Sequence, residues 1–328
     1  MAPIAVSLGD PAGIGPELIA AAWARRVEND LPPFFVVGGA GVLREAVPGL
    51  PVERIAAPGE PCAAFDRALP VLTDHDGPYR PGSPDVAGAR LALASLEGAV
   101  ALAVDGTASA VVTAPIAKGR LAEVGFAHPG QTEFVAAAAG ADPDDGVMML
   151  AGPQLRTVPV TVHCALAEVP ERLSIDLIVA RGRVVARALH GDFGIDRPRL
   201  AITGLNPHAG EDGRFGDEEA RIITPAIAAL RSEGVVASGP HPADALFAPR
   251  ARAGYDAALC MYHDQALIPL KTLDFDQGVN VTLGLPVVRT SPDHGTAFDI
   301  AGKGLADPGA TIAAIRMAGE IAARRSAT

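Results

Sequence analysis

Three histidines each follow an apolar segment that has the composition of a buried strand. They are His163 after residues 157–162, His208 after residues 199–203, and His263 after residues 255–261. Neighbouring strands of one sheet end side by side, so three such imidazoles could converge on one divalent ion. Three protein ligands with one open position is the arrangement of a catalytic zinc. No HxH or HxxxH spacing supports the site locally, and three independent histidines remain an open alternative.

The segment Cys260–Lys271 places an imidazole, a carboxylate and a cation close together in an apolar stretch. Carboxylate and amide oxygens near the histidines could accept hydrogen bonds from ring nitrogens and fix the rings. These neighbours are Asn206, Glu211, Asp244 and Asp264. The alternative for this segment is a buried imidazole and a lysine in a structural ion pair.

A second polar group consists of Lys271, Asn280 and Arg289, which lie at the ends of apolar segments. Two cations and an amide suit a small anionic substrate. Arginine can hold a phosphate or carboxylate through two parallel hydrogen bonds, and lysine adds a point charge. Charges at the exposed ends of strands would give the same pattern, so that alternative also stays open.

Two glycine-rich segments are candidates for contact with an anion or a nucleotide. Gly9–Glu17 (GDPAGIGPE) joins an apolar run to a helix, whose N-terminus would favour an anion. It lacks the GxGxxG spacing of a dinucleotide fingerprint, and a simple turn between strand and helix is the alternative. Ser291–Asp307 is rich in glycine and polar residues, which indicates a folded loop whose backbone N–H groups could wrap a nucleotide.

The composition excludes several classes of protein. The chain has 328 residues, of which 49% are hydrophobic and 20% charged, enough apolar surface for two folded domains. A net charge of −11 argues against nucleic-acid binding as the main task. Three scattered cysteines without a CxxC pair suit a reduced, cytoplasmic protein. We expect no signal peptide and no apolar run of membrane-spanning length.

Strand and helix patterns alternate along the chain, which predicts an α/β fold with largely parallel sheets. Strands are expected at residues 4–8, 34–37 and 110–113, and helices at residues 85–105, 170–190 and 311–324. Residues 147–150 and 157–162 are expected to pair across Gly152 and Pro153. Residues 216–232 are expected to form a helix, because an acidic first turn suits the helix dipole.

Three long motifs, in the same order along the chain, resemble the 4-hydroxythreonine-4-phosphate dehydrogenase family of the vitamin B6 pathway. They are Gly9–Glu17, Tyr262–Lys271 (YHDQALIPLK) and Arg289–Gly304 (RTSPDHGTAFDIAGKG). The resemblance implies the fold of the isocitrate and isopropylmalate dehydrogenases, with two α/β/α domains around a central cleft, in a homodimer. It also implies a discontinuous first domain, residues 1–128 plus 300–328. The second domain, residues 129–299, would carry the metal ligands and the dimer interface.

The resemblance also assigns residues to a metal, a substrate and a cofactor. The metal would be zinc, with magnesium or cobalt as alternatives, on His163, His208 and His263, with ligands contributed across the dimer interface. Asp244 and Asp264 would lie beside the metal. Substrate contacts would be Gln131, Thr132, Lys271, Asn280 and Arg289. NAD or NADP would bind the loop at His294, Gly295, Thr296, Ala297 and Asp299, which is similar to the loop that wraps adenosine in those dehydrogenases and explains the missing GxGxxG.

The chain departs from the family pattern at Gln131, where the family usually has histidine. Glutamine can donate a hydrogen bond but cannot carry charge or shuttle a proton. Ala245 and Ala266 replace threonine and glycine in two other motifs, and we interpret both as tolerated changes beside the site.

The activity implied is a metal-dependent, NAD(P)-linked oxidation of 4-phosphooxy-L-threonine in pyridoxal 5'-phosphate biosynthesis. The product, 2-amino-3-oxo-4-phosphooxybutanoate, would lose CO₂ to give 3-amino-2-oxopropyl phosphate. The alternatives are a dehydrogenase of a related 4-phosphorylated acid such as erythronate or threonate 4-phosphate, a metal-dependent hydrolase or aldolase without nicotinamide, and a non-catalytic metabolite-binding protein.

Overall fold

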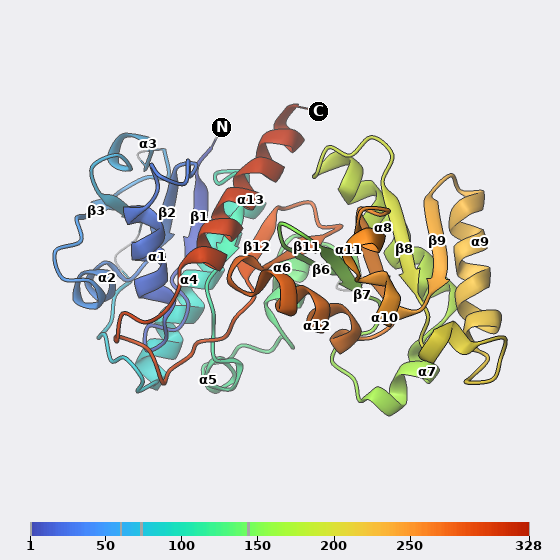
Figure 1. The fold of residues 1–328 in the computed structure, drawn as a ribbon. Helices are drawn as coiled ribbons and strands as arrows, with labels where there is room; N and C mark the ends of the chain where they lie inside the picture. Colours follow the sequence, from blue (N-terminus) through green and yellow to red (C-terminus); the bar gives the residue numbers. More distant parts are fainter. Residues whose placement is uncertain (1, 60, 73–74, 143–144, 328) are drawn as a thin grey trace. The chain divides into compact units, whose positions relative to one another are not determined.

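The computed structural model describes residues 2–59, 61–72, 75–142 and 145–327. The chain forms two compact units. Unit 1 contains residues 1–146 and 285–328, and unit 2 contains residues 147–284. Both chain ends therefore belong to unit 1 (Figure 1).

Residues 129–146 and 285–299, which the sequence placed in the second domain, lie in unit 1. Helix α6 (Gln131–Ala138) contacts helix α4 (Val86–Val104). Strand β12 (Arg289–Pro292) pairs in parallel with β5 (Val111–Thr113). These contacts attach both segments to unit 1.

The sheet of unit 1 has the strand order β3-β4-β2-β1-β5-β12. All of its neighbouring pairs are parallel. The other strands are β1 (Ile4–Ser7), β2 (Phe34–Val37), β3 (Val52–Ile55) and β4 (Leu69–Leu72). The other helices are α1 (Gly15–Ala24), α2 (Ala40–Ala46), α3 (Pro61–Ala64), α5 (Lys118–Glu123) and α13 (Gly309–Ala327).

Helix α4 forms much of the core of unit 1. Asp85 caps it, accepting a hydrogen bond from the Gly88 N–H at 2.7 Å, and Leu96 is fully buried in a cluster with Phe35. By length and composition alone α4 could span a membrane, which corrects the expectation that no apolar run is long enough. Half of its apolar window is buried inside the protein, as in the core helix of a folded domain.

The sheet of unit 2 has the strand order β11-β6-β7-β10-β8-β9. Strand β6 is antiparallel to both neighbours, and the other pairs are parallel. The strands are β6 (Val147–Ala151), β7 (Arg156–Pro159), β8 (Arg199–Thr203), β9 (Val236–His241), β10 (Ala257–Cys260) and β11 (Val279–Leu283). The α/β class, the largely parallel sheets and the β6–β7 pairing are thus confirmed.

Two predicted helices of unit 2 are interrupted. Residues 170–190 divide into α7 (Val169–Arg172) and α8 (Ile175–Gly191), because extended Ser174 begins a new helix by capping the Leu177 N–H at 3.1 Å. Residues 216–232 contain a π-helical turn, η4 (Glu219–Ile223), before α9 (Thr224–Ser232). The remaining helices are η2 (Leu166–Glu168), η3 (Pro207–Gly210), α10 (Ala243–Leu246), α11 (Pro249–Arg252), α12 (His263–Asp274) and η5 (Phe275–Gln277).

Candidate active site

The three candidate metal ligands follow three neighbouring parallel strands of unit 2. Strand β10 pairs in parallel with β7 on one side and β8 on the other. Because parallel strands end at the same edge of a sheet, His163, His208 and His263 all follow that edge. This is the edge at which α/β proteins build their sites.

Two of these histidines have unusual backbone conformations. His163 has φ of 46° and His208 has φ of 53°, both in the left-handed region. Residues other than glycine rarely adopt this conformation, and such residues cluster at functional sites. The strained backbone at both turns is consistent with a functional role for the two imidazoles.

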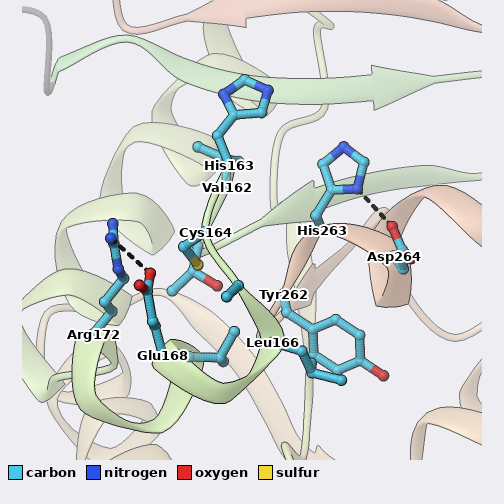
Figure 2. A pocket seen from close by; sticks show the side chains of 12 residues that line it. Val162, His163, Cys164, Leu166, Glu168, Arg172, Tyr262, His263 and Asp264 are labelled. Atoms are coloured by element: carbon cyan, nitrogen blue, oxygen red, sulfur yellow. Dashed lines mark hydrogen bonds and ion pairs between the residues drawn. The ribbon is translucent and has the colours of Figure 1, made fainter.

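His263 is oriented by its neighbour. Its Nδ1 lies 2.7 Å from Asp264 Oδ1 (Figure 2). A carboxylate at one ring nitrogen fixes the ring and leaves the other nitrogen as the better metal ligand. The ring centroids of His163 and His263 are 6.2 Å apart.

The His208 ring lies beside a different partner, Phe215, with 6.0 Å between ring centroids. Within the described ranges of this single chain, no three His, Cys, Asp or Glu side chains form a closed metal-binding group. In donor chemistry the set fits a zinc-type ion, since it supplies three imidazoles and a carboxylate beside one of them.

A pocket of about 650 Å³ opens beside two of the histidines. It is lined by residues between Thr161 and Arg172 and by Tyr262, His263 and Asp264. Figure 2 shows the His163 and His263 rings toward one end and the Glu168–Arg172 ion pair, at 2.9 Å, toward the other. Its volume suits a small metabolite.

Arg289 forms a separate polar centre in unit 1. Its side chain is buried, and Nε and Nη2 donate to Thr113 Oγ1 at 3.2 and 2.8 Å. Nη2 also donates to Gln131 Oε1 at 3.1 Å, and Nη1 donates to Thr132 Oγ1 at 3.4 Å. Burial lowers the pKa of Arg289 to about 10, opposed in part by Glu133. The side chain remains a cation at neutral pH, and an anionic ligand would compensate its desolvation.

Gln131 is held in one orientation. Its Nε2 donates to the Ala114 carbonyl oxygen at 3.3 Å, which turns Oε1 toward Arg289. Gln131, Thr132 and Arg289 are thus brought together in unit 1. Lys271, on α12, and Asn280, on β11, belong to unit 2.

Two other predicted site residues, Asn280 and Asp244, lie in different surroundings within unit 2. Asn280 has a buried Oδ1 that accepts no hydrogen bond from any residue described here. Asp244, in the first turn of α10, is exposed.

The candidate cofactor loop lies between β12 and α13 and packs against the first glycine-rich motif. The Ile14 N–H donates to the Thr296 carbonyl oxygen at 3.0 Å. A Cβ atom on Gly13 would lie 2.8 Å from that oxygen, so only glycine permits this approach. Ala297 has φ of 42°, and its side chain packs on the cluster of Ile14, Leu18 and Ala301.

The candidate cofactor residues differ in their contacts and exposure. His294 Nδ1 lies 3.0 Å from the Gly295 carbonyl oxygen, whereas Gly295 and Asp299 are exposed. The motif Gly9–Glu17 contacts the candidate cofactor loop through one backbone hydrogen bond, from Ile14 to Thr296.

Comparison with known proteins now identifies the family. The family model described as pyridoxal phosphate biosynthetic protein PdxA matches residues 30–318. The chain belongs to this PdxA family.

A 4-hydroxythreonine-4-phosphate dehydrogenase of Erythrobacter litoralis strain HTCC2594 is 67% identical over 328 residues, covering 99% of this chain and 98% of the relative. The crystal structure of a 4-hydroxythreonine-4-phosphate dehydrogenase from Klebsiella pneumoniae has a TM-score of 0.86 and 40% identity, covering 98% of this chain and 100% of that one. A terephthalate 1,2-cis-dihydrodiol dehydrogenase from Burkholderia xenovorans LB400 has a TM-score of 0.65 and 31% identity, with 97% of each chain covered. The resemblance in the sequence motifs is thereby confirmed.

In this PdxA-family chain, one residue that organises the site could not be assigned a role from the sequence. Gln265 is buried; its Oε1 accepts from Thr203 Oγ1 and from the Met261 N–H, each at 2.7 Å, and its Nε2 donates to the Gly204 carbonyl oxygen at 2.8 Å. It therefore ties the ends of β8 and β10 together. The sequence showed a polar residue after His263 and Asp264, but not that it was the buried one.

Proposed function

We propose that the protein is a metal-dependent, NAD- or NADP-linked 4-hydroxythreonine-4-phosphate dehydrogenase of pyridoxal 5'-phosphate biosynthesis, acting as a cytoplasmic homodimer. The observation that carries the proposal is 67% identity to a dehydrogenase of that name over 99% of this chain. Buried Arg289, surrounded by hydroxyl and amide oxygens, supports an anionic substrate.

The metal would be held by His163, His208 and His263, with Asp264 orienting His263 and Asp244 beside the ion. Zinc is the best match to this donor set, and magnesium or cobalt are the alternatives. When bound, such an ion supplies Lewis acidity that lowers the pKa of a substrate hydroxyl and polarises the resulting ketone. The three imidazoles, on turns that follow strand ends, would hold that ion in a fixed position.

Arg289, together with Gln131, Thr132, Lys271 and Asn280, would bind the anionic groups of 4-phosphooxy-L-threonine. Arginine offers two parallel donors to a phosphate, and lysine adds charge. Gln131 fixes the guanidinium plane through its amide oxygen and takes no part in proton transfer. The loop at His294, Gly295, Thr296, Ala297 and Asp299 would hold the dinucleotide, which would supply the hydride acceptor for oxidation at C3 of the substrate.

The test is reduction of NAD and NADP, followed as NADH or NADPH absorbance, with 4-phosphooxy-L-threonine as substrate. We expect turnover that stops with a chelator and returns with zinc. His208→Ala should abolish turnover while circular dichroism and the melting temperature stay near wild type. Turnover that survives complete metal removal would contradict the three-histidine site.

The same assay separates the alternatives. Erythronate and threonate 4-phosphate keep the 4-phosphate but lack the amino group, so a higher kcat/KM with either would move the assignment to a related dehydrogenase. A hydrolase, an aldolase or a binding protein would give no NADH with any of the three substrates.

A further inference from the structure

The loop that carries His208 closes on one buried carboxylate, that of Glu219. This side chain is 6% exposed. Its Oε1 accepts hydrogen bonds from the backbone N–H groups of Leu205 and Asn206, both at 2.8 Å. Its Oε2 accepts from Asn206 Nδ2 at 3.0 Å. Three donors therefore converge on a group that, when ionised, can only accept.

The loop needs such support because its backbone is strained. His208, Ala209, Glu211 and Asp212 have φ values of 53°, 51°, 42° and 56°, all left-handed. Residues with side chains remain in this conformation only where surrounding contacts dictate it. The Glu219 hydrogen bonds fix the chain two residues before the strained segment.

Two glycines of the loop approach the same carboxylate. A Cβ atom on Gly204 would lie 3.0 Å from Glu219 Oε1, and one on Gly210 would lie 2.6 Å from Oε2. The loop backbone thus encloses the carboxylate before and after His208. Glu219 also begins the π-helical turn η4, and such turns are frequent at functional sites.

We propose that Glu219 is the positioning residue that holds the strained loop and so fixes the place of His208. This inference rests on the proposed function only where it treats His208 as a metal ligand. Glu219 acts through the backbone of residues 204–210, and its carboxylate is the acceptor around which the turn closes.

The test uses Glu219→Gln in the full-length protein. The amide has one acceptor oxygen and no negative charge, and its NH₂ group faces one of the donors. One of the three hydrogen bonds is therefore lost, and those that remain, including the bonds from the Leu205 and Asn206 N–H groups, are weakened. In chelator-treated protein we expect hydrogen exchange at the Leu205 and Asn206 amides to accelerate about tenfold, with exchange in β7 and β10 unchanged. The Kd for zinc, measured by titration, should rise about tenfold.

The matched control is Asp217→Asn, a neighbouring acid with a 71% exposed side chain and a 3.4 Å surface pair to Arg221. It should leave exchange and zinc affinity at wild-type values. Gly210→Ala is a second test variant for the case that Glu219→Gln does not fold. It would place a Cβ atom 2.6 Å from Glu219 Oε2 and should give the same changes in exchange and zinc affinity.

Wild-type exchange at Leu205 and Asn206 in both test variants would overturn the proposal. So would faster exchange throughout unit 2 with unchanged zinc affinity, because Glu219 would then only stabilise the unit. If His208→Ala binds zinc as tightly as wild type, His208 is not a ligand and the proposed metal site fails, while the exchange result still decides the role of Glu219.

Discussion

Arg289 shows at the scale of one residue how a strand end becomes a binding centre. A guanidinium group has five donors in one plane, and a single hydroxyl, that of Thr113, accepts from two of its nitrogens. Thr113 ends β5, and Arg289 begins the neighbouring strand β12. The pairing of these strands therefore sets the plane in which an anion would meet the arginine.

Thr113→Val should damage substrate binding more than folding. Valine has nearly the same shape as threonine but removes the oxygen that accepts from Arg289 Nε and Nη2. A hydrogen bond to a charged group contributes about 1.5–3 kcal/mol, so its loss frees the guanidinium group to leave the orientation that binds an anion. We expect KM for the phosphorylated substrate to rise about tenfold. Thr113→Ser keeps the hydroxyl and should retain a KM near wild type; equal KM values for the valine variant and the wild type would remove Thr113 from the site.

We expect buried Asp10 to make the stability of the protein depend on pH. Asp10 is 1% exposed, and burial raises the pKa of its carboxyl above the ordinary 3.8, although the Ala12 N–H donates to Oδ1 at 3.0 Å and opposes the shift. A carboxyl with a raised folded-state pKa stabilises the fold below the unfolded pKa and loses that contribution as pH rises through the folded value. Asp10→Asn removes this dependence. The melting temperature of the variant relative to wild type should therefore increase from pH 4 to pH 7, and a constant difference across this range would contradict the account.

At the scale of elements, much of the site could be predicted because it depends on periodicity and strand ends. The strand Phe34–Val37, the helix capped by Asp85 and the β6–β7 turn are all local patterns, and the structure has them. The alternation of strands and helices predicts that β7, β8 and β10 share a parallel sheet. The place of β10 between β7 and β8 depends on contacts far apart in the chain. The polar residues beside the histidines are harder to predict, because the sequence shows that a residue is polar but not what it contacts.

Glu219 is the clearest case of that limit. In the sequence it is one of three acidic residues in a first helical turn, where the helix dipole accounts for all of them. In the structure its carboxylate binds the preceding loop instead. The contact depends on a left-handed segment at His208, and within it the residue types of Ala209 and Glu211 give no sign of a positive φ.

Close helix packing gives a prediction for α13. A Cβ atom on Gly319 would lie 2.6 Å from Cγ of Pro32, whose ring cannot move aside. We expect Gly319→Ala to lower the free energy of unfolding by about 1–3 kcal/mol, measured by urea denaturation. Gly191→Ala, at the end of α8 with no atom within 4 Å of the added Cβ, is the matched control and should raise stability by about 0.5 kcal/mol. If both changes alter the free energy of unfolding by the same amount, the close approach of Gly319 to Pro32 does not restrict the residue at this position.

At the scale of the whole molecule, the chain enters unit 2 at residue 147 and returns to unit 1 at residue 285. The first crossing follows a short run rich in Gly, Pro and Asp at residues 140–146, and the second follows Gly284. Neither crossing has a long low-complexity linker. The boundaries between the two units depend on which strands pair with one another. That is decided by contacts far apart in the chain, such as β12 with β5.

The last prediction concerns the proposed homodimer. One chain brings the His163 and His263 rings to 6.2 Å and places the His208 ring beside Phe215, so a site that joins all three residues could be completed by a second copy. If His208 and His263 of one site come from different subunits, His208→Ala and His263→Ala are each inactive alone. After co-refolding in equal amounts, half of the dimers are mixed and each mixed dimer has one intact site, so activity should return to about a quarter of wild type. Mixing His208→Ala with the double variant His208→Ala/His263→Ala provides the control, because no combination of those chains restores a site. No recovery in the first mixture, with mixed dimers verified by differently tagged chains, would place both histidines of each site on one subunit.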